Sequence, residues 1–125
     1  MKLNFWKPTT NLGIIKATVH QSGKLGFSRA ALDKLNLKRN TYIKIGTNSE
    51  DKNDNCVYMI VNNEEDESSM KISKAGEYYY LNMKDFFNEL GLDYKRKTII
   101  FDIIEIDANL FKLIPREKER KKKSK

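Results

Sequence analysis

Side chains that can carry positive charge are concentrated in the first part of the chain, where they could bind phosphate groups. Seven of them share this potential: Lys16, His20, Lys24, Arg29, Lys38, Arg39 and Lys44. A set of about five to seven cations on one face would give an affinity for nucleic acid that falls steeply with salt. Phosphate contacts carry no sequence information, so Gln21, Lys24 or Arg29 would have to reach base edges. The alternative interpretation is an ordinary lysine-rich face exposed to water.

Three consecutive tyrosines, Tyr78, Tyr79 and Tyr80, form a second candidate site. Alternation along a strand would place Tyr78 and Tyr80 on one face and Tyr79 on the other. At least one ring would then be exposed, and an exposed ring on a sheet can stack on a base. The acidic sequence around the tyrosines would repel phosphate, which favours packing in the core or contact with a protein partner. The tyrosines are therefore candidates both for base stacking and for contact with a protein partner.

The residues that could support catalysis or metal binding are few and poorly spaced. His20 is the single histidine, and no nucleophile or acid has a spacing that indicates a triad or dyad. Asp102 and Glu105 would face opposite sides of a strand. Cys56 is the single cysteine, so the sequence has no Cys and His cluster for zinc, and the six glycines are scattered singly. We expect a non-enzymatic protein with no catalytic residue, cofactor, metal or small-molecule substrate.

The net charge of +7 is distributed unevenly along the chain. Residues 1–48 carry a net charge of +8, residues 49–94 carry −7, and residues 116–125 carry +5. The basic part suits nucleic acid, and the acidic part suits self-association or a protein partner. We expect DNA as a partner, double-stranded rather than single-stranded, and a homo-oligomer. No apolar run is long enough for a signal peptide or a membrane span, which predicts a cytoplasmic protein without membrane contact.

Two stretches follow the same plan of tight turn, strand, short helix and next strand. They are Gly23 to Leu37 (GKLGFSRAALDKLNL) and Gly76 to Leu92 (GEYYYLNMKDFFNELGL), and they predict an internal repeat. The expected fold is α+β and mostly β, with two tandem strand–strand–helix–strand repeats in one compact barrel-like body. The expected divisions are an N-terminal arm (1–12), a basic first repeat (13–61), an acidic linker (62–69), a second repeat (70–115) and a disordered basic tail (116–125).

Local signals predict where the elements begin and end. Ser28 and Asn82 are expected to cap the starts of the two helices, and Gly91 is expected to end the second. The apolar run 56–61 predicts a strand that is covered on both faces. Pro115 is expected to end the last strand.

The stretch GIIKATVHQSGKLGFSRAALDKLNLKRNTYIKIG, followed by CVYMIVN, is similar to the swapped-hairpin transcription factor family of AbrB and MraZ. The resemblance implies a small β-barrel-like body, made by a dimer or a tandem repeat, whose basic strands and loops contact DNA. It implies that Gly23 makes the hairpin turn and that Lys24 and Arg29 belong to the DNA surface. The chain departs from the family at Ser28, where proline is usual, and at Asn36, where glycine is usual.

Two other interpretations stay open. The chain also resembles single-strand nucleic-acid binders of the PUR and Whirly type, which are built from duplicated strand-rich repeats with a helix. In those proteins the helix follows four strands, whereas here the expected helix follows two. A register of four strands that runs from Ile43 through Tyr80 into a helix at Met83–Leu90 also fits the sequence. The third interpretation is a protein-binding or structural assembly module of phage or mobile-element origin, in which the charge asymmetry drives head-to-tail association.

Overall fold

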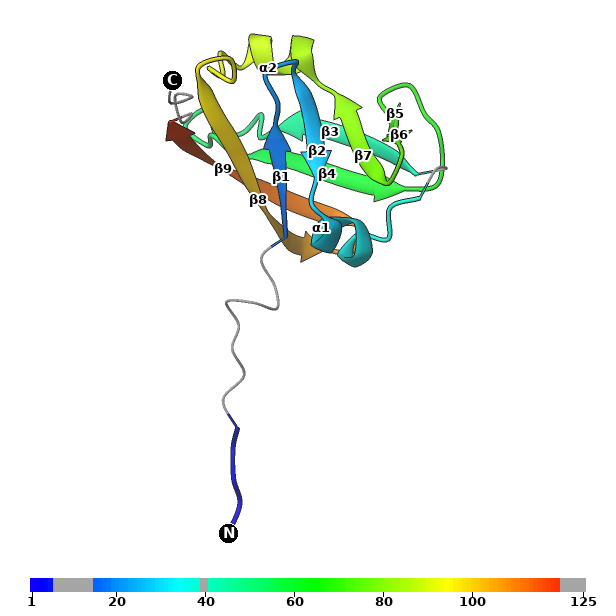
Figure 1. Ribbon diagram of the computed structural model, residues 1–125, viewed down its shortest axis with the longest axis vertical. Coiled ribbons are helices and arrows are strands. Elements are labelled where there is room, and N and C mark those ends of the chain that lie inside the picture. The colour runs from blue at the N-terminus through cyan, green and yellow to red at the C-terminus, as the bar shows by residue number, and fades with distance from the viewer. Residues whose placement is uncertain (6–14, 39–40, 120–125) are drawn as a thin grey trace, which may run out of the picture.

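The computed structural model describes residues 1–5, 15–38 and 41–119, and it is mostly β with two short helices. The elements are β1 (Ile15–Val19), β2 (Lys24–Phe27), α1 (Arg29–Lys34), β3 (Tyr42–Thr47), β4 (Val57–Asn62), β5 (Met70–Lys71), β6 (Ser73–Ala75), β7 (Tyr78–Asn82), α2 (Lys84–Glu89), β8 (Lys97–Asp107) and β9 (Leu110–Glu119). The strands form one antiparallel sheet in the order β5-β3-β4-β9-β8-β1-β2-β7-β6. This sheet curls into a nearly closed barrel (Figure 1).

The two ends of the sheet are held together by the chain itself. β5 and β6 lie at opposite ends of the strand order, yet a single residue, Ile72, separates them in sequence. Ile72 is buried, and its backbone N–H donates to the carbonyl oxygen of Thr41 at 3.1 Å. The barrel is therefore closed through a bend in the chain at Ile72 and not by a continuous ladder of backbone hydrogen bonds.

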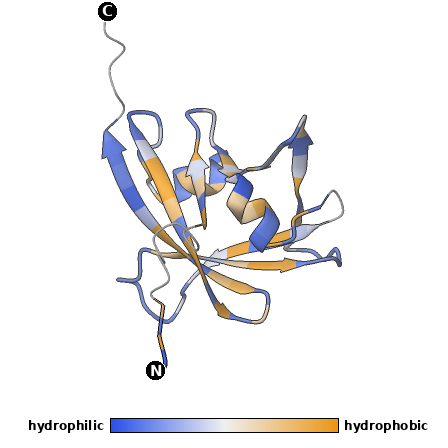
Figure 2. Ribbon diagram, turned by 60° about the horizontal axis from the view of Figure 1, so that its bottom comes forward, coloured by the Kyte–Doolittle hydropathy of each residue, from blue (hydrophilic) through white to orange (hydrophobic). Residues whose placement is uncertain are grey.

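The core lies inside the barrel, where alternate residues of each strand are buried. Ala17 and Val19 of β1 are fully buried, whereas Lys16, which precedes Ala17 in the same strand, is exposed. α1 follows β2 and α2 follows β7, and these strands run antiparallel, so the two helices lie at opposite ends of the barrel (Figure 1). Hydrophobic residues gather on the strands, and the loops are largely hydrophilic (Figure 2).

The two stretches of the expected repeat have the same order of elements. Each begins at the turn of a hairpin, β1–β2 or β6–β7, and continues through the second strand into a six-residue helix. Positive φ angles occur at matching positions: 87° at Gly23 and 64° at Gly76 in the turns, then 53° at Asn36 and 71° at Gly91 after the helices. Asparagine and glycine are the residues that tolerate this conformation best. Duplication itself stays a prediction.

The helix caps agree only in part with the sequence signals. Ser28 caps α1 as predicted, since its hydroxyl accepts from the backbone N–H of Ala31 at 3.1 Å. The prediction of Asn82 as the cap of α2 is wrong, because Met83 holds that position without a side-chain hydrogen bond. Asn82 instead ends β7, where it pairs with Lys24 of β2. The end of α2 before Gly91 is confirmed.

Two strand predictions also need correction. β4 is not covered on both faces, because its residues alternate and Ile60 is 40% exposed on the outside of the barrel. The last strand does not end at Pro115, and residues 116–119 are not part of a disordered tail, because β9 continues to Glu119. β8 supplies a partner along this whole length, whereas β4 pairs β9 only as far as Leu113. On the β4 side, proline therefore removes no N–H that the ladder needs.

A polar cluster orders the loop between β3 and β4. The Asp54 carboxylate accepts from the Tyr58 hydroxyl, from the Cys56 backbone N–H at 2.9 Å and from the Asn48 side-chain amide at 3.3 Å. The Tyr58 hydrogen bond, together with the one from Cys56, holds the pKa of Asp54 well below its ordinary value of 3.8. The same hydrogen bond raises the pKa of Tyr58 to about 12.

The turn glycines predict a difference in stability between two matched variants. A Cβ added at Gly76 would meet no atom within 4 Å, whereas one at Gly23 would lie 2.7 Å from the Lys84 Cα. Gly76→Ala should cost about 1 kcal/mol for its left-handed backbone. Gly23→Ala should cost a further ~1–3 kcal/mol, because backbone must move. Urea denaturation of both variants tests this, and equal losses would contradict the contact between the Gly23 turn and α2.

The Asp54 cluster predicts a pH-dependent contribution to stability. A carboxylate with a lowered pKa stabilises the fold above its ordinary pKa of 3.8, and this contribution is lost as the pH falls through the folded value. Tyr58→Phe should therefore lower the urea midpoint most at about pH 7, and its effect should shrink progressively as the pH falls below 3.8. The control is Tyr42→Phe, which removes a longer 3.4 Å hydrogen bond to Glu65. A loss that does not change with pH would show that Asp54 is not the partner that matters.

Candidate nucleic-acid interface

Strands β1, β2 and β7 are adjacent in the sheet and share an outer face. The alternation of β1 turns Lys16 and His20 outward, opposite the buried Ile15, Ala17 and Val19. Gly26 pairs with Tyr80 across β2 and β7, which places the tyrosines of β7 beside the cations of the first half. We call this surface the tyrosine–lysine face, and it comprises Lys16, His20, Lys24, Tyr78 and Tyr80.

Gly26 makes room for a side chain that crosses the sheet. A Cβ at Gly26 would overlap the Tyr78 hydroxyl oxygen and lie 2.8 Å from His20 Nε2, so these two side chains meet over the glycine. The Tyr78 hydroxyl is hydrogen-bonded to His20 Nε2, and the two rings meet edge to face with centroids 5.7 Å apart. Partial burial, with a smaller contribution from Tyr80, raises the pKa of Tyr78.

The tyrosines continue this chain of contacts to Lys24. The Tyr78 and Tyr80 rings stack with centroids 5.7 Å apart and an interplanar angle of 21°. Lys24 Nζ lies 4.6 Å from the centroid of the Tyr80 ring, within the range of a cation–π contact. These contacts form one continuous row of side chains, in the order Lys24, Tyr80, Tyr78 and His20. Both tyrosines are only half-buried, so ring surface stays accessible to a ligand.

The expected alternation of the tyrosines is confirmed, and their expected environment is wrong. Tyr78 and Tyr80 share the outer face, whereas Tyr79 packs at the edge of the core on the opposite side of β7. The acidic sequence around them does not determine their neighbours, because β7 pairs with β2 and brings Tyr80 against Lys24. Strand pairing, and not the neighbouring sequence, therefore determines which charges lie beside the tyrosines.

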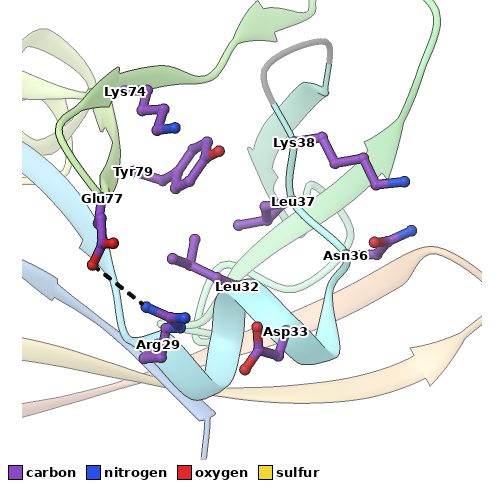
Figure 3. A pocket seen from close by; sticks show the side chains of 9 residues that line it. All are labelled: Arg29, Leu32, Asp33, Asn36, Leu37, Lys38, Lys74, Glu77 and Tyr79. Atoms are coloured by element: carbon purple, nitrogen blue, oxygen red, sulfur yellow. Dashed lines mark ion pairs between the residues drawn. The ribbon is translucent and has the colours of Figure 1, made fainter.

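The predicted cations do not all lie on one face. Lys16, His20 and Lys24 share the tyrosine–lysine face, whereas Arg29 and Lys38 line a pocket beside α1 (Figure 3). Lys44 lies on β3 and forms an ion pair with Asp66, which lowers the pKa of that carboxyl. Arg39 lies outside the described residues. A single surface formed by all seven cations is therefore excluded.

Two basic residues that the sequence analysis assigned to the disordered basic tail extend the tyrosine–lysine face from β9. Arg116 and Lys118 of β9 pair with Ile100 and Thr98 of β8, on the side of the sheet to which Thr18 also belongs. Arg116 is bound to Asp102, with 2.9 Å between its Nε and the carboxylate, and Lys118 is exposed. The alternating charges of residues 116–119 are compatible with a strand and could have indicated these positions.

The His20–Lys24 turn, at one end of the tyrosine–lysine face, lies at the same end of the barrel as the last residues of β9. β9 ends opposite Lys97, two residues before Ile99, and Ile99 pairs with Val19 next to His20. Residues 120–125, which follow β9, are arginine or lysine except for Ser124. The last described residue of β9 is therefore close to the His20–Lys24 turn.

The described residues include no group of three or more His, Cys, Asp and Glu side chains that could hold a metal ion. In the described part of the chain, no helix is long and apolar enough to cross a membrane. Comparisons with protein-family models, with curated proteins and with solved structures found no match to this chain.

The glycine under Tyr78 predicts a variant that alters the face without unfolding the protein. In Gly26→Ala the new Cβ would overlap the far end of a flexible side chain, so the Tyr78 ring should swing away from His20. NMR cross-peaks between the two rings should disappear, while the dispersion of the amide signals is retained. Gly46→Ala is the control, because a Cβ at this strand glycine meets nothing within 4 Å. Unchanged contacts between the rings in Gly26→Ala would show that Tyr78 does not lie over the glycine.

Proposed function

We propose that the protein is a non-enzymatic DNA-binding protein, a small transcriptional regulator, that contacts DNA through the tyrosine–lysine face. The observation that carries this proposal is the row Lys24, Tyr80, Tyr78 and His20, which joins cations to accessible rings on one exposed surface. Cations supply the sequence-independent attraction to phosphate, and aromatic rings on a sheet supply stacking surfaces. Lys16, Lys118 and the basic sequence after Glu119 would add to the attraction.

The arrangement of charges favours this function over head-to-tail assembly. The basic and acidic halves are not separate surfaces, because Arg29 lies 3.8 Å from Glu77 and Lys44 pairs with Asp66. These acids offset cations away from the tyrosine–lysine face. Within the face, Lys16 and Lys24 are not among the described ion pairs, so their charges stay available for phosphate.

The strand order supports the proposed tandem repeat and the likeness to swapped-hairpin barrels. Exchanging β1 with β5–β6, β2 with β7, β3 with β8 and β4 with β9 leaves every strand pairing in place. The β1–β2 pair becomes β6–β7, β1–β8 becomes β3–β5, and β3–β4 becomes β8–β9. The β2–β7 and β4–β9 pairs map onto themselves. One chain would then supply both halves of the barrel, and a homo-oligomer would not be needed to close it.

Single-stranded DNA is the second candidate ligand, and the tyrosines favour it. Bases can reach a protein ring only where they are unstacked from a duplex, and Tyr78 and Tyr80 present half-buried rings on an open strand surface. Double-stranded DNA would use the same cations through its phosphates and would leave the rings with little to contact.

Charge reversal on the face tests the proposal. Lys16→Glu with Lys24→Glu should lower DNA affinity by about tenfold or more at roughly 100 mM salt and reduce the salt slope by about two. Fluorescence anisotropy with double-stranded and single-stranded oligonucleotides at two salt concentrations measures both quantities and the strand preference. Lys52→Glu with Lys71→Glu changes the net charge equally at exposed positions elsewhere, and it should have a much smaller effect. Equal effects of the two double variants would leave only non-specific charge attraction and would overturn the proposed surface.

A further inference from the structure

A pocket between α1 and the β6–β7 hairpin lies apart from the tyrosine–lysine face (Figure 3). We call it the α1–hairpin pocket; Arg29 and Leu32 of α1, Lys38 of the following segment, and Lys74 and Tyr79 of the hairpin line it. Its volume of 380 Å³ falls at the lower end of the ~300–1,000 Å³ typical of small-molecule sites. Tyr79 points into it from the side of β7 opposite to Tyr78 and Tyr80.

The wall of the pocket is suited to a flat ring. Tyr79 and Leu32 are half-buried and pack against the edge of the core, and Leu37 is buried. Their side chains point toward one another across the same space (Figure 3). An aromatic ring placed there would gain contact with one aromatic and two aliphatic side chains, and stacking on tyrosine adds to simple burial.

The rim of the pocket is suited to an anionic group attached to that ring. Lys74 Nζ lies 5.6 Å from the Tyr79 ring centroid, so a positive charge already stands beside the ring. Lys38 and Arg29 stand on other sides of the pocket (Figure 3). Arg29 pairs with Glu77 at 3.8 Å, but both side chains are at least 75% exposed, and such a pair is weak. Arg29 could therefore turn toward a bound anion.

Three polar side chains, Asn36, Asp33 and Glu77, complete the lining. Asn36 contributes an amide, and Asp33 contributes an exposed carboxylate on the exposed side of α1. A carboxylate repels phosphate but accepts hydrogen bonds from the exocyclic amine of a base. The pocket thus combines a place for a ring, cations for a phosphate and an acceptor for an amine.

We propose that the α1–hairpin pocket binds a single nucleotide. The base lies against Tyr79, Leu32 and Leu37, and the phosphate faces Lys74, whose Nζ lies beside the Tyr79 ring. Asp33 gives preference to a base that carries an exocyclic amine. The nucleotide can be a free mononucleotide or an unstacked nucleotide of a bound strand, since both present the same chemistry. The pocket does not use the tyrosine–lysine face, so this inference stands independently of the proposed function.

Calorimetric titration of the full chain with 5′-GMP and with 5′-UMP, which lacks the amine, tests the proposal. GMP should bind more tightly than UMP, and Tyr79→Ala should weaken GMP binding by about tenfold. Tyr80→Ala is the matched control, because it removes the neighbouring tyrosine from the opposite face and should leave GMP binding unchanged. Thermal unfolding checks that both variants are folded. Lys74→Glu, with Lys71→Glu of β5 as its control, removes a cation while keeping the Tyr79 ring, in case Tyr79→Ala unfolds.

The outcomes separate the two sources of the nucleotide. Mononucleotide binding that is lost in Lys74→Glu supports the proposal with a free ligand. Binding only of a short single-stranded oligonucleotide, weakened by Tyr79→Ala and Lys74→Glu, supports it with a nucleotide of a strand. Folded variants that bind both ligands as the native chain does would overturn the proposal, and equal affinity for GMP and UMP would overturn the role of Asp33. Lys16→Glu with Lys24→Glu should leave GMP binding intact, which keeps this test distinct from that of the DNA surface.

Discussion

The pairing of β2 with β7 is the constraint on which the other features depend. It joins the two halves of the chain through Leu25 and Leu81, both fully buried, and a hydrogen bond of 3.1 Å from the Met83 N–H to the Gly23 carbonyl extends it. This pairing carries the helices to opposite ends of the barrel, because its strands are antiparallel. It also turns the β7 tyrosines toward the β1 and β2 cations and leaves Tyr79 facing α1. Both candidate sites therefore arise from one short ladder.

Local structure could be predicted from the sequence because its causes are local. Alternation located β1, the hydroxyl of Ser28 located the start of α1, and the turn glycines located both hairpins. Errors arose where a distant partner decides the outcome. Asn82 has the chemistry of a cap, yet the ladder with Lys24 uses it in a strand. Pro115 normally ends a strand, yet β8 extends far enough to hold β9 beyond it. No pattern within either segment indicates these partners.

The candidate sites show the same limit more strongly. The charges of the two halves differ in sequence, and this difference suggested two surfaces, one basic and one acidic. Folding mixes them, because β7 lies beside β2, Glu77 lies beside Arg29, and Asp66 lies beside Lys44. Residue types identified Lys16, Lys24 and the tyrosines as candidates, since each can contact a nucleic acid alone. Which of them share a face is set by strand order, and strand order depends on contacts between residues far apart in the sequence.

The place of β1 in the sheet has a consequence for how the chain is made. β1 is the first strand in the described part of the chain, and its two partners are β2 beside it and β8, whose matching residues are 99–103. During synthesis the outer edge of the β1–β2 hairpin therefore stays uncovered until residues 99–103 have left the ribosome. Pairing at such sequence distances is intrinsically slow, and unpaired apolar strands are prone to aggregate. A high net charge opposes such aggregation, so the lysines and arginines of residues 1–48 also favour the solubility of the nascent chain.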